Sequence, residues 1–470
     1  MSVDLRIYAH HGREFDRGEE VRIVYRGKPL KGFTKEPVAV ALYAAGVRTL
    51  ARSLKYHRPR GAFCFWGSCN SCRMRIGGLP GQRACKVMCS DGLEVDEESG
   101  VPSAQSDVLF AADFMYPNKM EYQHMLLRPA PLNRLFAKLV RKFASKAELP
   151  DAAARFGELK EERVDLMIIG AGTAGLALAR LVAGELKPLV VESHREPGGR
   201  LLLEPRSVET PWGSAPSGLE LARTWAKEAV DAGARFYVES EVVGFAEEGC
   251  WLVRRPDHLA AIWADRTVIA TGAYDQPAGF ANDDLPGVVS ARGIRRLVNY
   301  WGICPAVRAF VVGSGYDALV AAGELSAIGV KVMGVVEPGA KARCEELVGE
   351  VERLGVRVFF GYRARRATGR FHLTGIEIEP ASGVGERLKF ASDLIVVDEP
   401  PQPAYELLLQ AGVPVEFDAA CGRFVPKVDA GGLTGMDGLY AVGEVSGVES
   451  FGDIFRQVDK LSQYLLKEES

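Results

Sequence analysis

The chain has 470 residues, of which 47% are hydrophobic and 25% charged, and its formal net charge is −3 at pH 7. This length suggests about three domains, and the near-neutral charge argues against nucleic-acid binding. No apolar run reaches the roughly 18 residues of a membrane-spanning helix. Because residues 1–22 also lack an apolar signal core, we expect a cytoplasmic protein.

Residues 20–50 have the pattern of a strand, a turn and a helix. Apolar and charged residues alternate over 21–25, a turn is predicted at 26–28, and a helix is predicted over 37–45 with Gly46 as its stop. A cysteine-rich loop follows. This order predicts a small ferredoxin-like β-grasp domain over residues 1–105.

Five of the nine cysteines lie between residues 64 and 89. Cys64, Cys69, Cys72 and Cys85 have the C-x4-C-x2-C…C spacing of plant-type 2Fe–2S proteins, so we assign them as cluster ligands. A structural zinc ion remains an alternative, although zinc sites usually have two C-x2-C pairs and this region has one. Cys89 is interpreted as a spare buried thiol.

Residues 106–160 predict a helical linker with an apolar stripe and a basic opposite face. We interpret it as a connecting helix packed on a neighbouring domain. A docking helix for a partner, or for an acidic lipid surface at the membrane, remains the alternative.

From residue 161 strand-like and helical segments alternate, which predicts an α/β fold with doubly wound parallel sheets. Two glycine-rich turns indicate two dinucleotide-binding domains. We place an FAD-binding domain at 161–282 and 400–470, and an NAD-binding-like domain at 283–399.

The first glycine-rich turn is Gly170-Ala171-Gly172-Thr173-Ala174-Gly175, between a predicted strand at 166–169 and a helix starting at 176. The next strand ends in Glu192, an acid that can bind a ribose hydroxyl. Three later segments, at 198–200, 268–272 and 439–444, favour FAD over NAD. The residues assigned to this site are Gly170, Gly172, Thr173, Ala174, Gly175, Glu192, Ser193, Gly199, Arg200, Val242, Ala270, Thr271, Gly272, Gly443 and Glu444.

The second turn begins with Gly313-Ser314-Gly315, and the strand that follows ends at Glu337. We assign Gly313, Gly315 and Glu337 to nucleotide binding, with the acid favouring NAD over NADP. Bound NAD, another nucleotide and an empty scaffold remain alternatives for this fold. The sequence identifies no catalytic acid–base pair and no redox-active C-x2-C in the flavoprotein part.

Two segments resemble a known family. Residues 52–61 (RSLKYHRPRG) are similar to the N-terminal signature of the α subunits of hetero-oligomeric sarcosine oxidases, and residues 270–277 with 280–288 are similar to their flavoprotein segment. The same family includes α subunits of dye-linked L-proline and hydroxyproline dehydrogenases, opine oxidases and hydrogen cyanide synthase.

This resemblance implies an electron-transfer subunit that works with a separate, catalytic FAD-containing β subunit on an amine or imino acid. In some members an FMN lies between the subunits. The chain is shorter than sarcosine oxidase α and carries cluster ligands that many of those N-terminal domains lack, so folate-dependent one-carbon transfer is not expected. An NADH-dependent FAD/2Fe–2S acceptor reductase is the alternative function.

Overall fold

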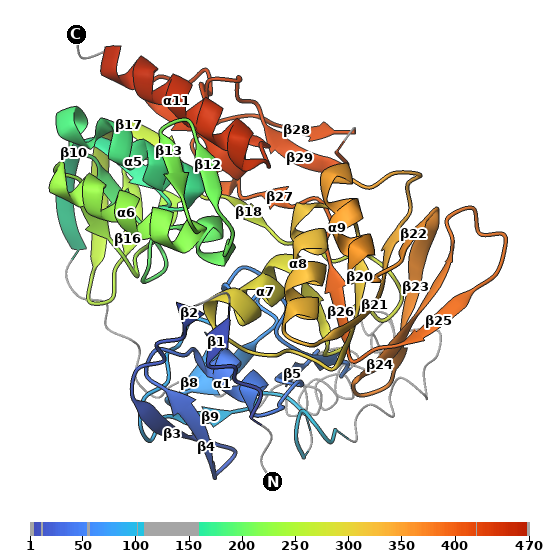
Figure 1. Cartoon of the computed structure of the whole chain (residues 1–470). Coiled ribbons are helices and arrows are strands. Elements are labelled where there is room, and N and C mark those ends of the chain that lie inside the picture. The colour runs from blue at the N-terminus through green and yellow to red at the C-terminus, as the bar shows by residue number, and fades with distance from the viewer. Residues whose placement is uncertain are drawn as a thin grey trace, which may run out of the picture. The chain divides into compact units, whose positions relative to one another are not determined.

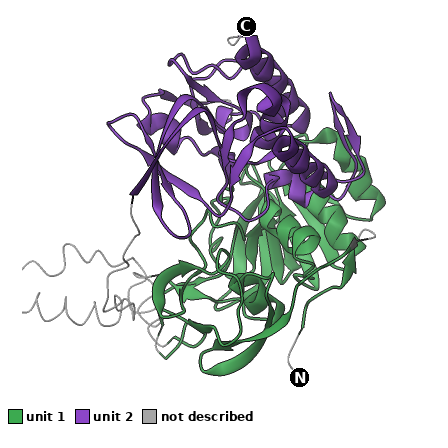
Figure 2. Cartoon of the chain, turned by 90° about the vertical axis from the view of Figure 1, so that its left-hand side faces the viewer, with its two compact units in different colours: residues 1–153, 275–399 green, residues 154–274, 400–470 purple. Residues whose placement is uncertain are grey.

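The structure is a computed structural model that describes residues 4–10, 13–53, 57–100, 102–107, 159–419 and 421–467. The chain forms two compact units, which Figure 2 distinguishes by colour. One contains residues 1–153 and 275–399, and the other contains residues 154–274 and 400–470. The predicted linker at 106–160 lies almost entirely outside the described residues.

The N-terminal part of the first unit is a five-stranded sheet with one covering helix, as predicted for a β-grasp domain. Strand order is β4-β3-β9-β7-β8. Alternate side chains of β3 are buried, and every residue of α1 is buried, because both elements face the same core. The bounds are β3 Glu20–Tyr25, β4 Lys28–Phe33, α1 Val38–Ala44, β7 Arg73–Ile76, β8 Leu79–Arg83 and β9 Glu94–Asp96.

The remainder of the first unit is a dinucleotide fold built on a parallel sheet of order β19-β26-β20-β21-β22. Its strands are β19 Val288–Ser290, β20 Arg308–Val312, β21 Lys331–Glu337, β22 Val358–Phe360 and β26 Leu394–Val397. Its helices are α7 Ala291–Arg295, a π-helix Arg296–Tyr300, α8 Tyr316–Ala327 and α9 Val348–Arg353. An antiparallel sheet completes it, with β23 Tyr362–Gly369, β24 Leu373–Pro380 and β25 Leu388–Ala391.

One hydrophobic core runs through the β-grasp domain and this dinucleotide fold. Ile23 and Leu42 of the former belong to the same buried cluster as Leu297, Val311 and Leu325 of the latter. The two folds therefore form a single packed unit instead of two domains on a flexible tether.

The second unit is the other dinucleotide fold. Its sheet has the order β14-β11-β10-β17-β16-β15, and β30 pairs in parallel with β17. The strands are β10 Leu159–Ile169, β11 Leu189–Val191, β14 Arg235–Tyr237, β15 Glu241–Phe245, β16 Trp251–Arg254, β17 Leu259–Ile269 and β30 Leu439–Ala441. Figure 1 shows α5 Thr173–Leu186, α6 Gly218–Asp231 and α11 Phe451–Lys467 gathered together in this unit.

Short elements fill the connections of both units. They are β1 Ala9–His10, β2 Arg13–Glu14, β5 Ala51–Arg52, β6 Pro59–Arg60, β12 Val208–Thr210, β13 Gly213–Ala215, β18 Ala273–Tyr274, β27 Gln402–Pro403, α10 Glu406–Gln410, β28 Val415–Asp418 and β29 Arg423–Pro426. The predicted class, two doubly wound dinucleotide folds with an N-terminal ferredoxin-like domain, is confirmed. Within the described ranges no helix has both the length and the hydropathy required to cross a membrane.

Candidate functional site

The four predicted cluster ligands lie together in the first unit. Cys64, Cys69 and Cys72 are on the loop between β6 and β7, and Cys85 follows β8, which pairs with β7. The sulfur atoms of Cys72 and Cys85 are 3.4 Å apart. The thiols of Cys69 and Cys85 also hydrogen-bond to Cys64, so the four sulfur atoms form one connected group.

The loop that carries these thiols is tightly curled. Phe65, Gly67 and Asn70 have φ angles of 51°, 86° and 57°, so three residues in this short segment have left-handed backbone conformations. For a bulky residue such as Phe65 this conformation is strained, and it persists only where the surrounding structure requires it. The curl directs the amide of Trp66 at the sulfur of Cys64 (3.3 Å) and the amide of Ser71 at that of Cys69 (3.5 Å).

The donor set fits an iron–sulfur cluster better than a zinc ion. Zinc needs four ligands around a single point. The described part of the chain contains no group of three or more His, Cys, Asp or Glu side chains placed to hold one metal ion. The thiols instead form one hydrogen-bonded row, in which Cys64 contacts Cys69 and Cys85, and Cys85 contacts Cys72. A row of four thiolates suits a cluster of two irons, each bound by two of them.

Arg296, which sequence reasoning missed, lies directly against the cluster loop. It is buried at the start of the π-helix, and its Nη1 donates to the carbonyl oxygen of Cys64 at 2.8 Å. Its guanidinium lies 4.9 Å from the ring centre of Trp66, and Asp275 is its ion-pair partner at 3.4 Å. Single π turns inside helices often occur at functional sites, but the sequence carries no signal for one.

The family signature also has a structural role. Arg58 makes a bidentate ion pair with Asp284, with Nη2–Oδ1 and Nε–Oδ2 distances of 2.6 and 2.7 Å, and it donates to Asn282 Oδ1 at 2.9 Å. The two segments that carry the resemblance, one near residue 58 and one near residue 283, are therefore joined by a planar charge-assisted contact. Residues 54–56 of the signature are outside the described residues.

We predict that Cys69→Ser abolishes the electron paramagnetic resonance signal of the reduced cluster, because a serine hydroxyl is a poor substitute for thiolate on iron. Cys89→Ser is the matched control. Cys89 is buried in the same domain, and its sulfur packs near Gly32. Loss of the signal in both variants, or in neither, would contradict the ligand assignment.

The first dinucleotide turn, in the second unit, has the space that a bound pyrophosphate needs. Gly170 has a φ of 99°, and a Cβ there would lie 2.5 Å from the carbonyl oxygen of Ala270. A Cβ on Gly175 would overlap the carbonyl oxygen of Gly170. A Cβ on Gly172, by contrast, would meet no atom within 4 Å. Gly170 thus permits the tight turn, Gly175 permits close packing, and Gly172 leaves room for a ligand to approach the backbone.

The acid after the second strand is held in place beside this turn. Glu192 Oε2 accepts from the amide of Ala171 at 2.8 Å, and Oε1 accepts from the amide of His194 at 2.8 Å. Burial acts to raise the pKa of Glu192, but the hydrogen bonds from His194 and Ala171 lower it overall, so the group is ionised. Ser193 donates to Glu192 Oε1.

Val242 is the least connected of the predicted FAD residues. It belongs to β15, which starts just after Ser240, whose amide donates to the carbonyl oxygen of Glu192. Val242 therefore follows a segment that borders the acid, and its direct role in binding remains a prediction.

The remaining predicted residues converge on the same turn. A Cβ on Gly199 would lie 2.8 Å from the Cα of Gly172, and a Cβ on Gly443 would lie 2.7 Å from the Cβ of Ala174. Arg200 pairs with Glu444 at 2.8 Å, both nearly buried. Sequence reasoning missed Gln457, whose Oε1 accepts from the amide of Gly443 at 2.9 Å.

Two threonines at this site differ in their hydrogen bonding. Thr271 donates to the carbonyl oxygen of Ala404 at 2.8 Å and so supports the backbone beside Gly272. Thr173, the first residue of α5, is buried, and its hydroxyl has no partner among the described residues. A buried hydroxyl at a helix N-terminus is a suitable donor to phosphate. The site therefore fits FAD.

We predict that Gly172→Val lowers the FAD content at least about tenfold, or more than about 1.4 kcal/mol in binding free energy, because the side chain occupies the pyrophosphate approach. Gly184→Val is the control, since Gly184 is exposed in α5 and a Cβ there would meet no atom within 4 Å. Flavin released on denaturation and circular dichroism measure occupancy and folding. A folded Gly172→Val with full FAD content would refute the assignment.

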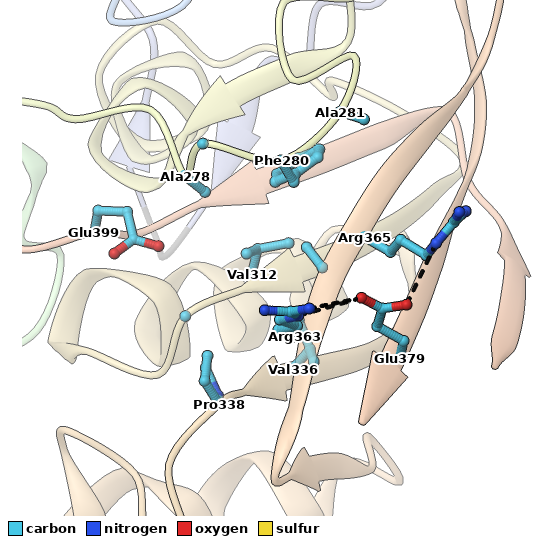
Figure 3. Close-up of a pocket in the computed structure, with 13 residues that line it drawn as sticks. Ala278, Phe280, Ala281, Val312, Val336, Pro338, Arg363, Arg365, Glu379 and Glu399 are labelled. Atoms are coloured by element: carbon cyan, nitrogen blue, oxygen red, sulfur yellow. Dashed lines mark hydrogen bonds and ion pairs between the residues drawn. The ribbon is translucent and has the colours of Figure 1, made fainter. Parts of the chain in front are cut away.

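The predicted residues of the second turn also lie together. Gly313 and Gly315 precede α8, and Glu337, at the end of β21, accepts from the hydroxyl of Ser314. A cavity of about 390 Å³ opens at the carboxyl ends of β20 and β21. Figure 3 shows Arg363 and Arg365 reaching Glu379 in its wall, with ion-pair distances of 3.0 and 3.3 Å.

Two protein families match this chain. Residues 18–100 match the 2Fe–2S iron–sulfur cluster binding domain, and residues 164–461 match the pyridine nucleotide-disulphide oxidoreductase family. The first range contains all four predicted ligands, and the second contains both glycine-rich turns. FAD and a 2Fe–2S cluster are therefore the cofactors of this chain.

Similar proteins include the sarcosine oxidase alpha subunit of Rhizobium meliloti (strain 1021), 28% identical over 68% of this chain and 34% of that protein. The A subunit of the opine oxidase of Agrobacterium tumefaciens (strain Ach5) is 25% identical over 60% of this chain and 61% of its own length. The chain thus spans about a third of the length of the sarcosine oxidase protein.

Solved structures show the same fold. The L-proline dehydrogenase of P. horikoshii superposes on 97% of this chain and 74% of its own, with a TM-score of 0.66 and 21% identity. The thioredoxin reductase of T. acidophilum covers 65% of this chain and 99% of its own, with a TM-score of 0.54 and 21% identity. Together with the family matches, these results show that the chain belongs to the pyridine nucleotide-disulphide oxidoreductase family of flavoproteins and carries an additional N-terminal 2Fe–2S domain.

Proposed function

We propose that this chain is the electron-transfer subunit of a hetero-oligomeric amine or imino-acid dehydrogenase, such as an L-proline or hydroxyproline dehydrogenase. The observation that carries the proposal is the presence in one chain of a cluster-ligand loop and an open flavin turn. Its relatives support it, because they are named as subunits of a sarcosine oxidase and an opine oxidase, and sarcosine and opines are both secondary amines.

The reaction assigned to the complex is the oxidation of a CH–NH bond to C=N on a separate β subunit, with two electrons and two protons leaving the amine. When bound to this chain, FAD can exchange electrons in pairs or singly and the 2Fe–2S cluster takes one at a time, so together they connect a two-electron donor to a one-electron acceptor. An FMN at the interface with the partner, as in some family members, remains a prediction.

The residues of this chain contribute binding and electrostatics. The open turn at Gly172, the buried hydroxyl of Thr173 and the ionised Glu192 would hold the dinucleotide part of FAD. The Arg200–Glu444 pair fixes the loop after the second strand against the end of β30. Around the cluster, Arg296 places a buried cation next to the loop of ligands.

A disulfide reductase function does not fit these residues, although thioredoxin reductase has the same fold. Such enzymes need two neighbouring cysteines that exchange electrons with the flavin. The single C-x2-C, at Cys69 and Cys72, belongs to the cluster loop. The cysteines outside the cluster domain each stand alone in the sequence; they are Cys250, Cys304, Cys344 and Cys421.

The chain loaded with its cofactors, assayed alone with proline, hydroxyproline, sarcosine and opines and a dye acceptor, is expected to show no turnover. The complex purified from the native source with its partner should oxidise one of these amines, and that amine should then reduce the cluster of this chain. A complex that contains the Cys69→Ser variant is the control. The same amine substrate should still reduce its flavin, but no electron paramagnetic resonance signal of a reduced cluster should form. Robust turnover by the single chain would show that the catalytic site lies within these 470 residues.

A further inference from the structure

The two dinucleotide folds of this chain can be compared residue by residue through their hydrogen bonds. The amide of Ala270 donates to Ile169, and the amide of Asp398 donates to Val312, each at 2.8 Å. Ala270 and Asp398 are therefore equivalent, each just past the strand that borders the glycine turn. Ala270 has only a methyl group, whereas Asp398 has a side chain long enough to reach the glycine turn of its fold.

The same comparison holds for the loop after the second strand. The carbonyl oxygen of Ala171 accepts from the amide of Gly198 at 2.7 Å, and that of Ser314 accepts from the amide of Cys344 at 3.0 Å. The first fold thus places Gly198 and Gly199, which have no side chains, over its turn. The corresponding loop of the second fold brings Arg343 to its turn.

These differences change the space in front of the middle glycine. A Cβ on Gly172 would meet nothing within 4 Å, whereas a Cβ on Gly315 would overlap Asp398 Oδ2 and lie 3.0 Å from Arg343 Nη2. In dinucleotide folds this glycine lets the backbone approach the pyrophosphate. The second fold has its own ion pair in that position.

Asp398 also makes the hydrogen bond that a phosphate would make. The amide of Gly315, at the N-terminus of α8, donates to Asp398 Oδ2 at 3.0 Å. Amides at this end of a helix bind anions, and here the anion is a carboxylate of the same chain. Arg343 Nη2 contacts the same oxygen at 2.5 Å and also donates to the carbonyl oxygen of Asp398.

Arg343 is held there by its backbone as well as by its side chain. Its amide donates to the hydroxyl of Ser314 at 2.9 Å, and that hydroxyl donates to Glu337. A change of side-chain rotamer alone would therefore leave the loop in place over the turn. Burial raises the pKa of Asp398 to about 6, and Asp317 adds to that shift while Arg343 opposes it. The carboxyl group is paired with Arg343 and occupies the amide of Gly315 that a pyrophosphate would need.

We propose that Asp398 and Arg343 close the second dinucleotide turn, so that this fold does not bind NAD(H) or another dinucleotide through its pyrophosphate. In the wall of the neighbouring cavity, Arg363 and Arg365 both form ion pairs with Glu379 (Figure 3). Electrons consequently do not enter this chain from NADH at the second fold. This inference concerns that fold alone and does not rest on the proposed amine dehydrogenase role.

The test is calorimetric titration of the FAD-loaded chain with ADP-ribose, which carries the adenosine and pyrophosphate of NAD but no redox group. The wild type is expected to show no binding at about millimolar concentration. Asp398→Ala, which makes the position match Ala270, should raise the affinity at least about tenfold, because it exposes the amide of Gly315 and frees Arg343 for phosphate. The Arg343→Ala variant should bind ADP-ribose as weakly as the wild type, since Asp398 still accepts the hydrogen bond from the amide of Gly315.

Glu352 is an exposed acid of α9, so Glu352→Ala is the matched control and should leave the affinity for ADP-ribose unchanged. The reciprocal variant, Ala270→Asp in the first fold, should reduce the FAD content and needs no ligand titration. Binding of ADP-ribose by the wild type as tightly as by Asp398→Ala would overturn the proposal. The proposal would equally be overturned if a folded Asp398→Ala variant showed no gain in affinity for ADP-ribose, or if the Ala270→Asp variant kept all its FAD.

Discussion

A contact between two backbone segments governs both dinucleotide folds of this protein. In each fold the first glycine of the turn lies against the carbonyl oxygen of the residue that follows a neighbouring parallel strand, Ala270 in one case and Asp398 in the other. The contact leaves no room for a Cβ, so glycine is required, and it places the side chain of the residue after the strand next to the pyrophosphate position. An alanine there leaves the first turn open for FAD, and an aspartate there fills the second turn with an ion pair.

The second fold retains a structural purpose even when it is closed. It shares one hydrophobic core with the 2Fe–2S domain, and it supplies Arg296 to the cluster loop and Asp284 to the family signature at Arg58. These contacts explain why a dinucleotide fold would persist without a dinucleotide: it supports the cluster domain. The segments that carry the family resemblance owe at least part of their sequence to this packing.

The sequence alone predicted the features that depend on local spacing. The four thiols, both glycine turns and the acids at 192 and 337 are recognisable because each sits at a fixed distance from a strand or a neighbouring ligand along the chain. Arg296 with Asp275, and Arg343 with Asp398, were missed because their partners lie at least 21 residues away and their residue types are ordinary surface types. Only folding shows that one guanidinium is buried beside the cluster loop and that the other fills a nucleotide position.

The proposed electron transfer requires that one chain bind both an FAD and a two-iron cluster. The most direct measurement is the content of iron, acid-labile sulfide, zinc and FAD in protein purified anaerobically from its native source. We expect about two irons, two sulfides and one FAD per chain, with little zinc. Stoichiometric zinc with no sulfide, or a flavin-free protein with an intact fold, would contradict this expectation.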